Sequence, residues 1–93
     1  MEPTARLARR VRHDFGADAE LVLAALAELP GYAASERVQA AMVRLADGDL
    51  GRLDVQLREA LSDWRDVLVA AGLAHEDWPE RLDADLGPAG ADA

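Results

Sequence analysis

The sequence predicts an all-α fold: an antiparallel bundle of four main helices plus a short fifth helix near the C-terminal end. Apolar residues recur every three or four positions along most of the chain, which is the spacing of one helical face. No segment alternates apolar and polar residues in the manner of a half-buried strand. Glycine, proline and capping residues interrupt the pattern, and the short connections between the helices favour antiparallel neighbours.

The first two helices are predicted over residues 3–15 and 19–29. Pro3 suits a first helical turn, where its missing N–H costs nothing, and Gly16 favours the left-handed backbone that ends a helix. Asp18 is expected to cap the second helix. The apolar arc of that helix is wider than one stripe, so we expect it to contact more than one neighbour. Its expected buried face consists of Leu21, Val22, Ala25, Leu26 and Leu29.

The third and fourth helices are predicted to begin after the capping residues Ser35 and Asp49. Gly48 and Gly72 are expected to follow their C-terminal ends, because glycine adopts the left-handed conformation at no steric cost. The fourth helix, residues 50–71, carries the clearest apolar stripe in the chain. The members of this stripe are Leu50, Leu53, Leu57, Leu61, Trp64, Leu68 and Ala71.

The short last helix is predicted to follow Asp77 as its cap, with Pro79 in its first turn. Residues 1–86 are expected to form a single helical-bundle domain, and residues 87–93 a flexible tail. The residues expected at the centre of the core are Val11, Phe15, Leu26, Met42, Leu57, Leu61, Trp64 and Leu68.

Charge is spread unevenly over the 93 residues, whose net charge is −8. Residues 1–13 hold four of the 10 basic residues and one of the 18 acidic residues, a net charge of +3, which leaves −11 for residues 14–93. An acidic body repels phosphate backbones and attracts basic partners. Nucleic acid is therefore not an expected partner.

Several classes of chemistry are excluded or disfavoured by residue type. The chain has no cysteine, hence no disulfide, thiolate metal site or thiol nucleophile. No apolar run approaches the ~20 residues that cross a bilayer, so we expect no membrane partner and a cytoplasmic location. Asp47-Gly48-Asp49 lacks the glycine and glutamate that a calcium loop requires further on, and a helix stop followed by a cap is the better interpretation. We predict no cofactor, no metal site and no catalytic residue.

A basic face is one of two candidate binding features. It consists of Arg6, Arg9, Arg10 and His13 on the first helix. Such a face can meet nucleic acid, an anionic membrane or an acidic protein. It lacks the interleaved aromatic residues on which bases stack, and packing against the acidic helices of the same chain is the favoured alternative.

The other candidate is a partner surface on the fourth helix. Val55, Ser62 and Val69 repeat every seven residues on the side opposite the Trp64 stripe, among charged neighbours. Isolated surface valines are ordinary, and the segment 78–86 could fold over Val69. The remaining alternative is a weak surface for a partner or for a second copy of the chain.

Residues 35–83 resemble a family of small uncharacterised actinobacterial helical proteins. The stretches "LSDWRDVLVAAGL" and "EDWPERL" carry most of the likeness. The resemblance implies a bacterial, cytoplasmic helical domain and brings no catalytic residues.

These features together predict a non-enzymatic protein-interaction module with an acidic body, whose partner is another protein or a second copy. The alternative is an acidic inhibitor, resembling an antitoxin or an immunity protein, that covers a basic partner. An enzyme would need a cleft that pairs carboxylates as acid and base, and seventeen acidic residues in residues 14–93 make chance pairs common.

Overall fold

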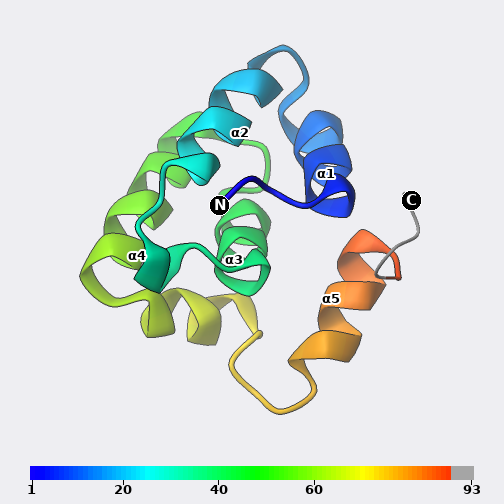
Figure 1. The fold of residues 1–93 in the computed structure, drawn as a ribbon, viewed down its shortest axis with the longest axis vertical. Coiled ribbons are helices and arrows are strands. Elements are labelled where there is room, and N and C mark those ends of the chain that lie inside the picture. The colour runs from blue at the N-terminus through cyan, green and yellow to red at the C-terminus, as the bar shows by residue number, and fades with distance from the viewer. Residues whose placement is uncertain (89–93) are drawn as a thin grey trace.

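Five α-helices and two 3₁₀ turns make up residues 1–88, which are the residues that the computed structural model describes (Figure 1). This part of the chain contains no strand, so the predicted all-α class is confirmed. Residues 89–93 of the predicted tail lie outside the described residues. The elements are α1 (Ala5–Phe15), η1 (Gly16–Asp18), α2 (Ala19–Ala27), η2 (Gly31–Ala33), α3 (Glu36–Ala46), α4 (Leu50–Ala71) and α5 (Trp78–Leu86).

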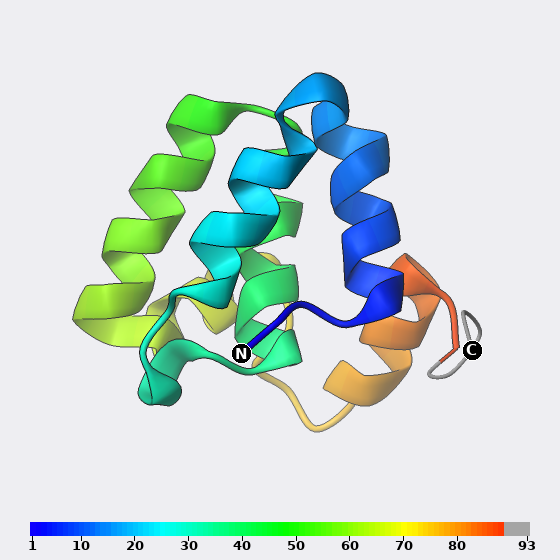
Figure 2. The same ribbon diagram turned by 45° about the horizontal axis from the view of Figure 1, so that its top comes forward.

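The helices α1, α2, α3 and the first half of α4 alternate in direction along the chain, as Figure 2 shows. The most extensive helix–helix contact is between α3 and α4. Small side chains at their buried positions permit this close approach, and α5 packs against α1 at the other side of the molecule (Figure 1). The buried alanines of the pair are Ala40, Ala41, Ala46, Ala60 and Ala71.

Two of the predicted caps are present. The Ser35 hydroxyl accepts a hydrogen bond from the Val38 N–H at 3.1 Å, and Asp49 accepts one from the Arg52 N–H at 2.9 Å. Each satisfies an N–H that the first helical turn leaves without a backbone partner. The end of α4 at Gly72, in the left-handed conformation, is also as predicted.

Four other helix ends differ from the prediction. Thr4 caps α1, so the helix begins at Ala5 and Pro3 precedes it. Asp18 and Asp77 make no side-chain capping bond; Asp18 ends a 3₁₀ turn, and Asp77 pairs with Arg81. The second helix ends at Ala27 rather than at residue 29, because the chain must turn ahead of Pro30.

One buried apolar cluster joins all five helices. Leu57 and Trp64 are half-buried at its edge, and the expectation that Leu61 lies in the core is wrong, since its exposed fraction is 48%. The predicted core residues that are buried are Val11, Phe15, Leu26, Met42 and Leu68.

A break in α4 at Asp63 explains why the apolar stripe predicted over residues 50–71 does not form a single buried face. The backbone of Asp63 is extended, with φ −153° and ψ 97°, between two helical segments. Its carboxylate accepts a hydrogen bond from the Arg65 N–H at 3.1 Å, as an N-terminal cap does, and the Tyr32 hydroxyl donates to the Leu61 carbonyl at 3.3 Å. Both ends of the break thus have substitute hydrogen bonds, and α4 changes direction there (Figure 1).

Replacing this cap should destabilise the protein modestly. Asp63→Ala is expected to lower the free energy of unfolding by about 0.5–2 kcal/mol, because the Arg65 N–H loses its partner at the start of the second segment. Urea denaturation followed by circular dichroism measures the change. Asp66→Ala, at an exposed position in the same segment, is the control, and an equal loss for both variants would contradict the capping role.

The turn between α3 and α4 tolerates no side chain at Gly48. Gly48 has φ +80°, and a Cβ atom there would lie 2.7 Å from the backbone carbonyl oxygen of Asp14, which cannot move aside as a side chain can. Gly72 has a similar φ of +75°, but its Cβ would meet only a guanidinium nitrogen of Arg81, at 3.4 Å. The turn that contains Gly48 therefore packs closely against the backbone at the end of α1.

Gly48→Ala should therefore lower the free energy of unfolding by about 1–3 kcal/mol more than Gly72→Ala does. Both substitutions place alanine in the left-handed conformation, which is unfavourable for a residue with a Cβ atom, but only the one at Gly48 adds a clash with a backbone atom. Thermal and urea denaturation of the two variants, side by side, measure the difference. Equal stabilities would show that the loop relaxes freely.

Candidate functional site

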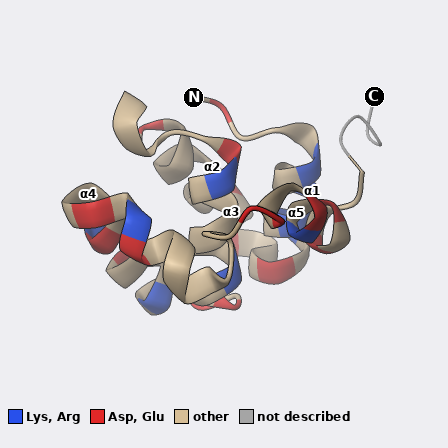
Figure 3. Ribbon diagram, turned by 90° about the horizontal axis from the view of Figure 1, so that it is seen from below, with Lys and Arg blue, Asp and Glu red and all other residues tan. Residues whose placement is uncertain are grey.

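The basic face of α1 lies against the C-terminal end of α5. Arg6, Arg9, Arg10 and His13 line an open hollow of about 370 Å³ together with residues 85–87. Figure 3 shows basic residues of α1 beside acidic residues of α5. The four predicted residues are thus close together, and what they face is another helix of the same chain.

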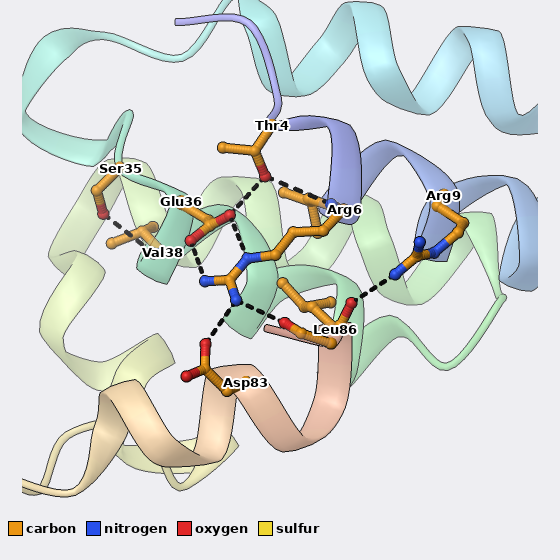
Figure 4. Close-up of polar contacts among 10 residues, drawn as sticks. Thr4, Arg6, Arg9, Ser35, Glu36, Val38, Asp83 and Leu86 are labelled. Atoms are coloured by element: carbon orange, nitrogen blue, oxygen red, sulfur yellow. Dashed lines mark hydrogen bonds and ion pairs between the residues drawn. The ribbon is translucent and has the colours of Figure 1, made fainter. Parts of the chain in front are cut away.

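Arg6 is the centre of this contact, and sequence reasoning missed its burial. Its exposed fraction is only 8%. The guanidinium donates two hydrogen bonds to the Glu36 carboxylate of α3, of 2.6 and 2.9 Å, and one to the Asp83 carboxylate of α5, of 2.7 Å (Figure 4). A planar guanidinium matches a carboxylate in this two-bond geometry, so Arg6 ties three helices together.

The same contact changes the acidity of Glu36. Hydrogen bonds from Arg6 lower the pKa of the Glu36 carboxyl, the Thr4 hydroxyl lowers it further, and partial burial opposes both. The hydrogen bonds that Arg6 donates to Glu36 in turn raise the pKa of Arg6. The pair is therefore ionised throughout the physiological range of pH.

Glu36→Gln should reveal this coupling as a pH dependence. A carboxyl whose pKa is lowered by folding stabilises the folded state above its ordinary pKa of 4.5, and this contribution is lost as the pH falls through the lower folded-state value. The stability difference between wild type and Glu36→Gln, from urea denaturation, should be constant near neutral pH and shrink in acid. Glu59→Gln, at an exposed position, is the control. A difference that persists undiminished to about pH 3 would contradict the coupling.

Three arginines of α1 also cap α5. Arg10, Arg9 and Arg6 donate to three successive backbone carbonyls, those of residues 85, 86 and 87, at 3.2, 2.9 and 2.7 Å respectively. The last carbonyls of a helix lack backbone partners and carry its negative dipole end. The last turn of α5 has no basic residue of its own, so α1 supplies the cations from outside (Figure 4).

The remaining charges around the hollow balance these arginines. Arg10 pairs with Asp14 at 2.9 Å, and Asp85 is paired by Arg44 of α3. The side chain of His13 is 84% exposed and lies 3.0 Å from Asp14. The arrangement can hold helices together, and its balanced charge gives little attraction for a polyanion. Two features of the sequence indicate this packing of α1 on α5: the arginines are spaced as one helical face, and the last helix has no basic residue in its last turn.

The second predicted surface is divided by the break in α4. Val55 lies before Asp63 and Val69 after it, so the seven-residue repeat does not define one continuous helical face. Val55 lines a shallow hollow of about 340 Å³ on this side of α4, whereas Ser62 and Val69 lie outside that hollow. Val69 is 67% exposed, so α5 does not cover it.

A groove between α2 and α4 is the feature that sequence reasoning did not locate. It encloses about 250 Å³, and apart from Asp54 its lining is apolar. Its large exposed side chains are Leu21, 68% exposed, and Leu50, 42% exposed. The lining residues are Leu21, Val22, Ala25, Leu50, Leu53, Asp54 and Leu57.

Leu21 corrects the expected buried face of α2. Val22 and Leu26 point into the core, and Leu21 lies on the flank of the helix that borders α4. The width of the apolar arc did predict a second neighbour for α2. In the structure, α4 stands across the groove from Leu21 and leaves it largely uncovered.

One acidic residue, Asp54, lines this groove, and two more lie near the two ends of its α2 wall. Asp18 directly precedes α2 and Glu28 directly follows it, at spacings of three residues from Leu21 and Ala25 respectively, and both are exposed. Neither has an ion-pair partner among residues 1–88, and the sequence has no basic residue between Asp14 and Glu36. Asp54, on the α4 side, pairs with Arg58 at 2.9 Å. The groove is therefore apolar inside, and its α2 side has an acidic residue without an ion-pair partner near each end.

Within residues 1–88, no group of three or more histidine, aspartate or glutamate residues is placed to hold a metal ion. Among the same residues, no helix is both long and apolar enough to cross a bilayer. The likeness of residues 35–83 to small actinobacterial proteins stays a prediction, because in comparisons with known proteins the chain matches no family model, no curated protein and no solved structure.

Proposed function

We propose that this protein is a non-enzymatic interaction module that binds an apolar face of another protein in the groove between α2 and α4. The observation that carries the proposal is the exposure of Leu21 and Leu50 on opposite walls of one apolar hollow. Scattered surface leucines are ordinary, but facing ones around a shared groove are typical of a binding surface.

The titrating groups favour binding over catalysis. Within residues 1–88, two carboxyl groups, those of Glu36 and Asp77, have a clearly altered pKa, and in both an arginine lowers it. A carboxylate with a lowered pKa is a weak base and a poor proton donor at neutral pH. The polar clusters of α1 and α5 are engaged with one another, which supports a structural role for them.

The second candidate, an acidic inhibitor that covers a basic partner, is favoured by one specific observation. Three of the four arginines in the basic segment are bound to groups of α3 and α5, which leaves the solvent-facing charge of the body dominated by acids. A negative surface of this kind accelerates association with a basic protein and makes it sensitive to salt. Both candidates bind protein, and they differ in whether apolar contact or charge supplies the affinity.

Affinity capture with matched variants tests the groove. Tagged wild type, Leu21→Gln and Val69→Gln are used as baits, and each captured protein is then purified and titrated against all three. Leu21 and Val69 have nearly equal exposed fractions, 68% and 67%, so the two substitutions alter the surface equally. Loss of a buried leucine contact should weaken binding about tenfold or more in Leu21→Gln alone.

Three results would contradict the proposal. Equal binding to Leu21→Gln and wild type would exclude the groove. Loss of binding in Val69→Gln alone would move the site to the outer face of α4. Binding that is lost at high salt but is unchanged by Leu21→Gln and by Val69→Gln would favour the acidic inhibitor.

A further inference from the structure

We infer that the occupant of the groove is an amphipathic helix of a partner protein, with lysine or arginine residues flanking its apolar face; this inference rests on the proposed function. Three features support this choice of occupant: the helical walls of the groove, the acidic residues near the ends of α2, and the burial of the apolar face of α1 in the core of its own chain.

The walls of the groove favour a helix over an extended peptide. Both walls are helices, whose backbone groups are bonded internally, so an extended peptide would find no sheet edge to pair with. Its own N–H and C=O groups would lose water in an apolar hollow without replacement. A helix satisfies its backbone internally and presents only side chains.

The length of the groove sets the spacing of the partner's anchors. Figure 2 shows α2 and the first half of α4 running in the same direction. On the α4 wall, Leu61, 48% exposed, follows the lining residue Leu57 by one helical turn, and the hydroxyl of Tyr32 in η2, 58% exposed, donates to the Leu61 carbonyl at 3.3 Å. The eleven-residue rise from Leu50 to Leu61 is about 16 Å, or three helical turns. The partner should therefore place apolar residues at positions i, i+4, i+7 and i+11.

Charge selects a basic partner helix. Asp18 and Glu28 lie near the two ends of α2 and have no ion-pair partner within residues 1–88. Cationic side chains that flank the partner's apolar face would pair with these carboxylates, while acidic ones would be repelled. Arg58 already pairs with Asp54, so the attraction is concentrated on the α2 side.

A second copy of this chain fits the groove poorly. In a two-fold contact the same surface meets itself, which would bring the acidic residues of two grooves together. The helix with the largest positive charge among residues 1–88, α1, buries Leu7 and Val11 completely in its own core. It could not offer that apolar face to another copy without unfolding the bundle.

Three labelled peptides of about 15 residues test the inference by fluorescence anisotropy. The first has leucines at i, i+4, i+7 and i+11 with flanking lysines, the second replaces each lysine with glutamate, and the third scrambles the leucine positions of the first. We expect the first peptide to bind wild type about tenfold or more tightly than either of the others, and to weaken with added salt.

Variants of the protein identify the surface. Leu21→Gln, and separately the double variant Asp18→Asn with Glu28→Gln, should each weaken the lysine peptide about tenfold, whereas Val69→Gln should not. Equal binding of the lysine and glutamate peptides, or indifference to Leu21→Gln, would overturn the inference. So would a dimer in sedimentation velocity that Leu21→Gln abolishes, since the occupant would then be a second copy.

The two proposals can fail separately. If no peptide binds but capture of a partner still depends on Leu21, the occupant is wrong and the interaction module stands. If neither peptide binding nor capture depends on Leu21, both fall.

Discussion

Arg6→Met is expected to lower the free energy of unfolding by about 3 kcal/mol. Removing one partner of a largely buried ion pair leaves the other charge without compensation, and here Glu36, with a side chain only 21% exposed, would keep its carboxylate next to an apolar neighbour. Asp83 is 51% exposed and would be hydrated instead, which keeps the loss near the lower end of the range for buried pairs.

Urea denaturation at neutral pH measures this loss, and Arg12→Met is the matched control. Arg12 also lies on α1, but its side chain is 58% exposed and its contact with Glu20 is long, at 3.8 Å. The control should therefore change the stability by no more than about 1 kcal/mol. Similar losses in the two variants would mean that the contact to Glu36 contributes no more than a surface pair.

The contrast between Arg6 and the helix caps shows which parts of the fold the sequence could predict. Ser35, Asp49 and Gly72 act on groups within a few residues along the chain, so local patterns were sufficient to place them. Arg6 bonds residues 30 and 77 positions away. Nothing in a local helical pattern distinguishes a solvated arginine from one that enters such a contact.

The break in α4 could be predicted from the sequence only in part. Asp63 followed by Trp64 and Arg65 is compatible with a helix start, yet the apolar stripe runs through it without a gap. Periodicity averages over many residues and cannot detect one extended residue, so Leu61 was assigned to the core.

The candidate site could be predicted only in part. The wide apolar arc of α2 indicated a second neighbour, and the acidic composition of residues 14–93 indicated a basic partner. The groove itself depends on how far α2 stands from α4. That distance is a property of the tertiary structure, which no local sequence pattern encodes.

Leu26→Ala is expected to be among the most damaging single changes, lowering the free energy of unfolding by about 2–5 kcal/mol. Leu26 has no exposed surface, and its removal leaves a cavity in the core that neighbouring side chains fill only in part. Leu61→Ala removes the same atoms from a position that is 48% exposed and should cost about 1 kcal/mol or less. Helical periodicity alone assigned both leucines to the core, so the difference between the two variants measures what the break at Asp63 does to the stripe. Guanidinium denaturation of both variants, fitted with a common slope, gives that difference. Equal losses would mean that Leu61 is buried in solution, and the exposed apolar surface that follows the groove one turn beyond Leu57 would then be absent.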